Sequence, residues 1–201
     1  MPQQAAAVKP GSNKNLIIGI VVIVAVIAAI VVSIFVLGGK KSGGKDDDDS
    51  PKYEQPIQDL CDGLMKADSK KIYRATMPEA VIKYYEKEGY IDWDILDETM
   101  EDALDEFKDE FGDNFKLDYK VKSKNKLSKS DIEDYESTYS MWASMTDADE
   151  DEFVPSQAYE LKIKLTAKGS DDSDTDEGTV VVAEVDGDWI FLDMGFMSNI
   201  T

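Results

Sequence analysis

Two acidic clusters, at residues 147–152 and 171–177, offer the oxygen ligands that a hard cation such as Ca²⁺ requires. In the second cluster, Asp172, Asp174 and Asp176 occupy the first, third and fifth positions of a calcium-binding loop. The sixth position holds glutamate where the loop needs glycine, and the twelfth holds alanine where it needs glutamate. We therefore interpret both clusters as solvated loop tips, with weak metal binding through Asp172, Asp174 and Asp176 as the alternative.

A second set of residues could bind a ligand. Arg74 is the only arginine, and its guanidinium is suited to carboxylates and phosphates. Tyr84, Tyr85 and Trp93 have apolar rings with polar tips and could line a pocket. These four residues form the predicted ligand site. The alternatives are an ion pair between Arg74 and a nearby acid, and core packing of the rings.

Basic residues are concentrated in one segment of the chain. Its lysines are Lys116, Lys120, Lys122, Lys124, Lys126 and Lys129. They could hold an anionic cell-wall polymer or an acidic partner. The interpretation that we favour is structural, because lysines on a sheet edge discourage pairing with another chain.

Composition excludes several kinds of chemistry. The chain has no histidine, which removes the usual general base and the commonest transition-metal ligand. Its single cysteine, Cys61, excludes an internal disulfide and falls on the apolar face of a predicted helix. Residues 46–201 contain 17 basic and 42 acidic residues, a net charge of −25, which argues against a nucleic-acid partner. We find no catalytic or cofactor motif, and we expect neither a cofactor nor enzymatic activity.

Apolar residues at helical spacing predict three helices in the first half of this acidic region. The first spans residues 55–67. The second begins at Thr76 and stops at Gly89, and the third has Asp92 as its N-cap and Gly112 at its C-terminal end.

The second half changes to the alternation of a β-sheet. Residues 115–127 predict a strand with one buried and one lysine-lined face. A capping box at 130–133 predicts a helix that ends near residue 143. Three further strands are predicted at 156–167, 179–186 and 188–193. The last two are joined by Asp186-Gly187, a type I′ hairpin signal, and the whole order indicates an α+β domain.

This order of elements resembles the NTF2-like, or cystatin-like, cone, in which helices wrap against a curved antiparallel sheet. The resemblance lies in the opening QPIQDLCDGLMKADSKKIYRATMPE, the inserted LSKSDIEDYES and the closing VVVAEVDGDWIFLDM. It is similar to extracytoplasmic domains that Gram-positive bacteria carry after one transmembrane helix. The resemblance implies a cone whose mouth often holds a ligand. A few members are isomerases or dehydratases, and the lack of histidine excludes the dehydratase type of site.

Residues 16–37 form an uncharged apolar stretch of 22 residues. At about 1.5 Å per residue a helix of this length spans roughly 33 Å, enough for a hydrocarbon core of about 30 Å. No cleavage site follows, so we expect an uncleaved anchor. Ala25, Ala29 and Ser33 fall on one side of it and predict a weak dimer contact, although chance produces such a stripe in an Ala- and Val-rich span.

The remaining segments complete a single-pass architecture. Residues 1–15 form a short polar tail, 38–51 a flexible Gly/Ser/Asp linker and 52–201 the acidic domain. Lysines flank both ends of the anchor and do not decide its orientation, but the short tail and the resemblance favour an extracytoplasmic domain. We expect a cell-membrane protein whose domain is a non-enzymatic binding or interaction module for a protein, small-molecule or cell-envelope partner. An isomerase- or hydrolase-like enzyme and an oligomerisation or assembly module are the alternatives.

Overall fold

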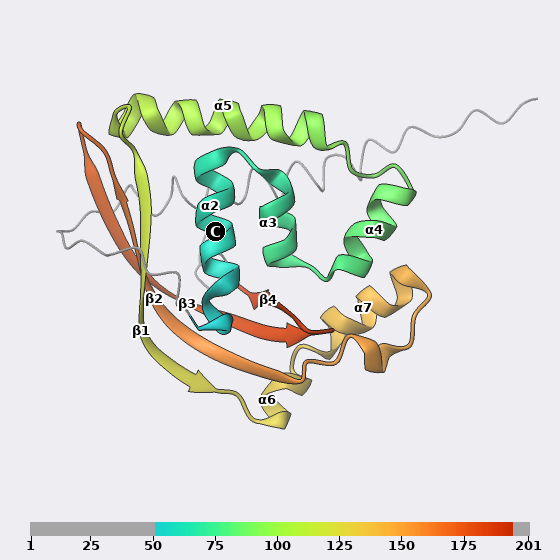
Figure 1. The fold of residues 1–201 in the computed structure, drawn as a ribbon. Coiled ribbons are helices and arrows are strands. Elements are labelled where there is room, and N and C mark those ends of the chain that lie inside the picture. The colour runs from blue at the N-terminus through green and yellow to red at the C-terminus, as the bar shows by residue number, and fades with distance from the viewer. Residues whose placement is uncertain (1–50, 195–201) are drawn as a thin grey trace, which may run out of the picture.

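The computed structural model describes residues 51–194 and shows an α+β domain, with helices first and strands afterwards (Figure 1). The helices are η1 (Lys52–Glu54), α2 (Gln55–Lys66), α3 (Ser69–Thr76), α4 (Glu79–Lys87), α5 (Trp93–Phe111), α6 (Lys129–Glu133), α7 (Glu136–Thr146) and η2 (Glu150–Glu152). The strands are β1 (Lys116–Lys126), β2 (Gln157–Lys168), β3 (Ser173–Val185) and β4 (Asp188–Asp193). The predicted fold class is confirmed.

The four strands form one antiparallel sheet in the order β1-β2-β3-β4. Strands β1 and β4 are its two edges and do not pair with each other, so the sheet is open. The expected curved cone is not formed by the described residues. One reason is that β4 is short and pairs only with the end of β3 between Val181 and Val185. The other end of the long β2–β3 hairpin therefore has no fourth strand that could continue a curl.

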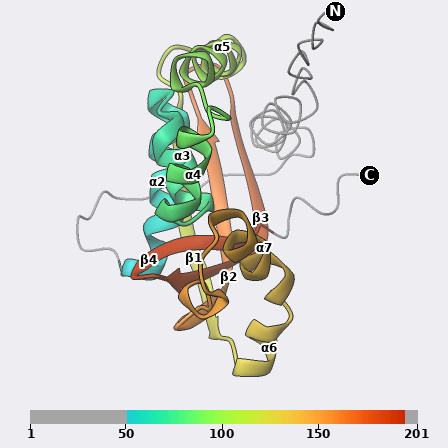
Figure 2. The ribbon, with the colours of Figure 1, turned by 90° about the vertical axis from the view of Figure 1, so that its right-hand side faces the viewer.

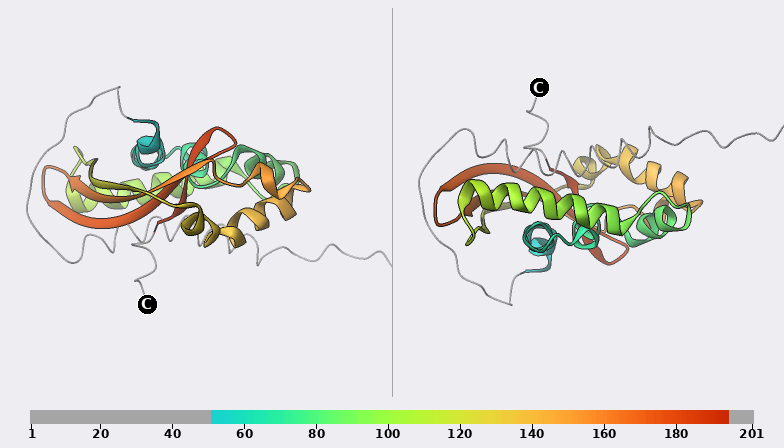
Figure 3. Two further views of the ribbon diagram at one scale, coloured as in Figure 1. Left: turned by 90° about the horizontal axis from the view of Figure 1, so that it is seen from below. Right: turned by 90° about the horizontal axis from the view of Figure 1, so that it is seen from above.

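Helices cover the two faces of the sheet unequally. Helices α2 and α3 pack on one face, where Ile57 and Cys61 contact a row of β2 and β3 side chains that includes Leu161 and Val180. Helix α5 crosses the ends of α2 and α3 (Figure 1) and closes a second cluster around Met100. Figure 2 and the left panel of Figure 3 show α6 and α7 on the opposite side of the strands from α2.

Helix α7 covers only one end of that second face. Its Tyr139, Trp142 and Ala143 pack on a cluster that contains Ala158, Ala183 and Ile190. These three residues lie opposite one another on β2, β3 and β4. Beyond them, no described helix covers this face.

The predicted helix at 55–67 is confirmed, but the helix expected from Thr76 is wrong at its start. Thr76 instead ends α3, and α4 begins at Glu79 after Pro78. Sequence periodicity missed α3 because it has only eight residues. Two aspartates stabilise its first turn: the Asp68 side chain accepts from the Lys71 N–H at 3.1 Å, and Asp97 of α5 accepts from the Ser69 N–H at 2.9 Å.

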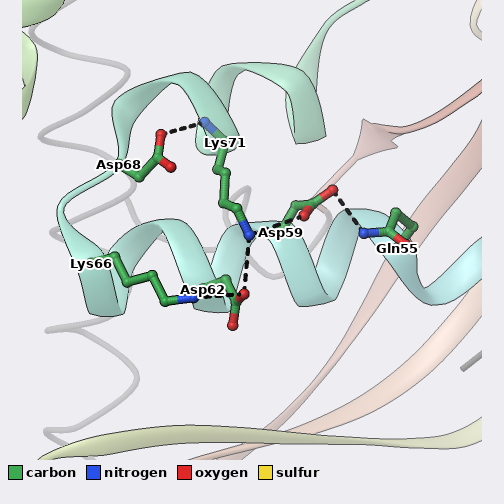
Figure 4. Close-up of polar contacts among 6 residues, drawn as sticks. All are labelled: Gln55, Asp59, Asp62, Lys66, Asp68 and Lys71. Atoms are coloured by element: carbon green, nitrogen blue, oxygen red, sulfur yellow. Dashed lines mark hydrogen bonds and ion pairs between the residues drawn. The ribbon is translucent and has the colours of Figure 1, made fainter. Parts of the chain in front are cut away.

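A small charge network joins α2 to α3 (Figure 4). The Lys71 ammonium donates to Asp62 at 3.0 Å and lies 3.8 Å from Asp59, while Lys66 donates to Asp62 at 3.2 Å. The Lys71 hydrogen bond holds the pKa of Asp62 below its usual range, and the same contact raises the pKa of Lys71. The network fixes the turn at Ala67, which has a left-handed backbone with φ of 51°.

The remaining boundaries follow local signals. Asp92 caps α5 and Gly112 ends it, as predicted. The capping box lies two residues earlier than expected, at Ser128 and Asp131, and the predicted single helix is divided into α6 and α7 around Tyr135. Asp186 and Gly187 both have positive φ, which confirms the type I′ hairpin signal.

Within residues 51–194, no helix has the length and apolarity needed to cross a membrane. The predicted span at 16–37, its dimer stripe and nearly all of the linker lie outside the described residues.

Candidate functional site

Arg74 lies in the last turn of α3, on the surface. Its Nε is 3.5 Å from Glu79 Oε2, at the start of α4, and both side chains are exposed. This is the ion pair that the sequence offered as the alternative to ligand binding. An exposed pair of this kind contributes little to stability and leaves the other guanidinium nitrogens accessible.

Tyr84 and Tyr85 are brought together on α4, and Tyr90 completes a half-buried group of three rings. The centroids are 5.9 Å apart for Tyr84 and Tyr85, 6.2 Å for Tyr84 and Tyr90, and 6.1 Å for Tyr85 and Tyr90. The Tyr85 hydroxyl donates to Met145 Sδ at 3.7 Å, and burial raises the pKa of Tyr85. The group therefore packs α4 against α7.

Trp93 is the first residue of α5, and its ring contacts side chains of three other residues. Its ring meets Tyr73 edge to face at 5.3 Å, its Nε1 donates to Glu86 Oε1 at 2.8 Å, and the Lys70 ammonium lies 5.3 Å from the ring centroid. Tyr73 was not among the predicted ligand residues. Its hydroxyl is buried and has no hydrogen-bond partner among the described residues, and burial raises its pKa to about 12.

The acidic residues of the second cluster lie mostly in a strand, which corrects the expectation of a loop tip. Strand β3 begins at Ser173, well before the predicted start at 179. Asp172, Asp174 and Asp176 each accept a hydrogen bond from the backbone N–H of the next residue, at 2.7, 2.6 and 2.7 Å. No group of three or more Asp, Glu, Cys or His side chains among residues 51–194 could hold a metal ion.

The strand extends through this acidic segment because β2 supplies matching partners. Thr175 lies opposite Thr166, and their hydroxyls are 3.0 Å apart. Glu177 lies opposite Lys164, and its carboxylate lies 3.6 Å from the Lys122 ammonium and 3.5 Å from that of Lys162. Cross-strand contacts of this kind compensate for the low strand propensity of aspartate.

The lysines of β1 divide between the two faces of the sheet. A register shift between Val121 and Ser123 leaves Lys122 as an extra residue, that is, a β-bulge. After the bulge, Lys124 lies opposite Leu161 and therefore shares the helix-covered face. Its ammonium lies 4.2 Å from the Tyr53 ring centroid and 4.9 Å from that of Tyr159.

On the open face, the lysines of β1 meet a second set from β2. Lys116 lies directly opposite Lys168, and Lys120 lies directly opposite Lys164. We call the whole set the lysine face: Lys116, Lys120 and Lys122 of β1, and Lys162, Lys164 and Lys168 of β2. The acids that share this part of the sheet are Asp118, Glu160, Glu177 and Asp193, which follows Glu160 and Val181 in one cross-strand row, so positive charges exceed negative ones by two. This is a local reversal of sign in a strongly acidic domain.

A third aromatic group lies where the described chain begins. Tyr159 and Trp189 are stacked with centroids 5.8 Å apart, and Tyr53 lies 5.3 Å from Tyr159. Beside them, burial raises the pKa of Glu54, although hydrogen bonds with Tyr119 and Tyr53 oppose the shift. These rings fix η1 and the start of α2 on the sheet.

Cys61 is buried in α2, as its position on the apolar face predicted. Burial raises the pKa of its thiol to about 12, so the thiolate is nearly absent at neutral pH. The position and pKa indicate a core residue.

No protein-family model, curated protein or solved structure matches this chain.

The lysine face is the feature that sequence reasoning missed. The lysines of β1 stand out in the sequence, but nothing is assigned to Lys162 and Lys164 within the predicted strand 156–167, and Lys168 lies just beyond that strand. A signal was present in the alternation of lysine along both strands, at 116–122 and at 162–168. Only the register of β1 against β2 shows that the two rows lie side by side.

Proposed function

We propose that this chain is a single-pass, membrane-anchored binding module whose acidic domain lies outside the cytoplasm and whose contact surface is the lysine face. The observation that carries the proposal is the uneven covering of the sheet. One face is packed under α2 and α3, while the other is covered by α7 only around Ala158 and Ala183. The uncovered remainder is a long, charged surface on a rigid support.

The character of this surface favours binding over assembly through apolar contacts. An oligomerisation module would be supported by an exposed apolar sheet face. The open part of this sheet is instead lined by lysine, acidic and threonine side chains. The exposed large apolar residues of the described region are Ile95 on α5, Met141 on α7 and Val154 in the segment after η2, and they are far apart in the sequence.

A kinship with NTF2-like domains also belongs to this proposal. It is supported by the order of helices before a meander and by the hairpin at Asp186-Gly187. The anchor is supported by the length and apolarity of residues 16–37.

An enzyme of the isomerase or hydrolase type remains the second candidate, on one observation. The buried Tyr73 hydroxyl lacks a partner among the described residues, and a buried polar atom without one is uncommon in folded proteins. A small molecule bound beside α3 and α5 would satisfy it. The test compares the parent chain with a Tyr73→Phe variant. If the two are equally stable and act equally on added ketones, this support is removed.

The topology can be tested by cysteine labelling in intact cells. Glu88 is exposed at the end of α4, and a Glu88→Cys variant would place a reactive thiol on the surface. The parent chain is the matched control, because its only cysteine, Cys61, is buried with a pKa of about 12. We expect a membrane-impermeant maleimide to label the variant in unbroken cells and to leave the parent unlabelled. Labelling that required cell lysis would show that the domain lies on the cytoplasmic side.

A further inference from the structure

We propose that the lysine face binds a linear phosphate polymer, with phosphate groups held between cross-strand pairs of lysines. This inference takes its contact surface, the lysine face, from the proposed function and adds the class of ligand that the surface binds.

Two pairs of like charge stand directly opposite each other on neighbouring strands. Lys116 faces Lys168, and Lys120 faces Lys164. Side chains at such positions are only about 5 Å apart at Cβ, and like charges there destabilise a sheet. None of these four ammonium groups has an ion pair in the described part of the chain. The free domain therefore carries a repulsion that a bound anion would relieve.

Protection of the sheet edge accounts for only half of this arrangement. Lysines on β1 are expected if they prevent pairing at an exposed edge. Strand β2 is an interior strand, hydrogen-bonded to β1 on one side and β3 on the other. Lys162, Lys164 and Lys168 thus protect no edge.

The third lysine pair shows how an anion fits. The Glu177 carboxylate lies between Lys122 and Lys162, at 3.6 and 3.5 Å from their ammonium groups. This carboxylate comes from the neighbouring strand β3 and reaches diagonally across the face. Lys122 is offset from Lys162 by the bulge, whereas Lys116/Lys168 and Lys120/Lys164 are directly opposed. Glu177 is also the β3 neighbour of Lys164, but neither of these two pairs has a carboxylate at ion-pair distance in the described part of the chain. Each can hold one external anionic group in the way that the third pair holds Glu177.

The spacing of the two free pairs suits a linear ligand. Lys116 and Lys120 are four residues apart on β1, which corresponds to about 13 Å at roughly 3.3 Å per residue. Both pairs lie along the strand direction, so a ligand that engages both must extend along the sheet. A single small anion would occupy one pair only.

The lysine face favours phosphate over a carboxylate-rich peptide or a nucleic acid. Lysine is a common phosphate ligand and binds it as a point charge, and the one arginine of the sequence, Arg74, which could bind an anion bidentately, lies on α3. A peptide that added to the free edge of β1 would pair with the backbone of that strand and would not need the lysines of β2. Bases of a single-stranded nucleic acid need aromatic rings for stacking. Tyr159 lies opposite Val182 on the helix-covered face, beside Lys124 and on the other side of the sheet from the lysine face.

The test uses the full-length chain in nonionic detergent and fluorescently labelled inorganic polyphosphate, with binding followed by anisotropy. The variant Lys120→Gln/Lys164→Gln removes one free pair. The control Lys124→Gln/Lys126→Gln removes the same charge from the same region, but from the helix-covered face of β1. We expect the first variant to weaken polyphosphate binding about tenfold and to reduce its salt dependence, because phosphate contacts release counterions. We expect the control to bind within about twofold of the parent.

Thermal unfolding separates this proposal from a structural role for the lysines. The first variant should unfold at the temperature of the parent or above it, since a repulsive pair has been removed. A clear decrease in that temperature would show that Lys120 and Lys164 stabilise the sheet, and would overturn the proposal. Absence of polyphosphate binding by the parent, or equal loss in the control variant, would overturn it as well.

Two competitors test the ligand class. Poly-L-glutamate and single-stranded DNA should displace labelled polyphosphate at least tenfold less effectively than unlabelled polyphosphate does. Equal displacement by either would overturn the phosphate assignment. Binding in detergent does not depend on the side of the membrane, so these results and the labelling result in cells fail independently.

Discussion

The hydrogen bonds between Asp97 and Ser69 offer a direct test of how α3 is held in place. Asp97 Oδ1 accepts from the Ser69 backbone N–H at 2.9 Å and from its hydroxyl at 2.5 Å. Ser69 is only 1% exposed, so water reaches neither donor freely. An Asp97→Ala variant leaves both donors unpaired at the first turn of a short helix.

The expected loss follows from the cost of unpaired buried donors. Hydrogen bonds to charged groups contribute about 1.5–3 kcal/mol each, and partial water access to half-buried Asp97 lowers the sum. We expect the free energy of unfolding to fall by about 3 kcal/mol. For a domain of this size, roughly 2–4 °C accompanies each kcal/mol, so the unfolding temperature should fall by about 6–12 °C.

Tryptophan fluorescence can follow this unfolding in the full chain, because Trp93, Trp142 and Trp189 all lie in the described domain. Two controls accompany Asp97→Ala. Asp97→Asn keeps an acceptor oxygen and should lose about 1 kcal/mol, while Glu98→Ala changes an exposed neighbour and should stay within about 0.5 kcal/mol of the parent. A loss below about 1 kcal/mol for Asp97→Ala would refute the role assigned to these hydrogen bonds.

Three further outcomes are expected. Gly169→Ala should lower the free energy of unfolding, measured by urea titration, by about 2–3 kcal/mol, since its Cβ would lie 1.7 Å from the Phe111 carbonyl oxygen. The control Ser170→Ala should change that free energy by less than about 0.5 kcal/mol. Lys71→Met should destabilise the domain modestly at neutral pH. The difference in stability from the parent should vanish as the pH falls through and below the lowered pKa of Asp62. The reason is that an acid with a depressed folded-state pKa contributes stability only above that pKa. The thiol of Cys61 should react with a disulfide reagent only at the rate of domain opening, and fast reaction under native conditions in a stopped-flow assay would contradict its burial.

Sequence reasoning succeeded where one local signal decides the structure. Asp92 and Gly112 delimit α5 as expected, because capping and positive φ are properties of single residues and their neighbours. The same holds for Asp186-Gly187, which sets the register of β3 against β4. Such features need no knowledge of the rest of the fold.

The sequence predictions failed where residues distant in the sequence determine the local structure. Helix α3 depends on Asp97, which is 28 positions from Ser69 in the sequence. The early start of β3 depends on partners in β2, which outweigh the turn-like composition of residues 171–177. The two-sided distribution of the β1 lysines depends on a bulge at Lys122 that no alternation pattern reveals. The open sheet likewise follows from the short pairing of β4, and a list of predicted strands does not contain that information.

The packing of the first helix against the last strand has a consequence for the order of events during synthesis. Ile57 and Cys61 of α2 share one cluster with Phe191 of β4, although more than a hundred residues separate them in the chain. The part of the α2 packing surface that Phe191 supplies is therefore absent until β4 has been synthesised, whereas the contacts of α2 with α3, α5 and β1 can form earlier. Closing so long a loop is slow compared with forming neighbouring helices. The domain accordingly completes its fold only once β4 is available, and a chain truncated before β4 would leave part of α2 exposed to proteases and to aggregation.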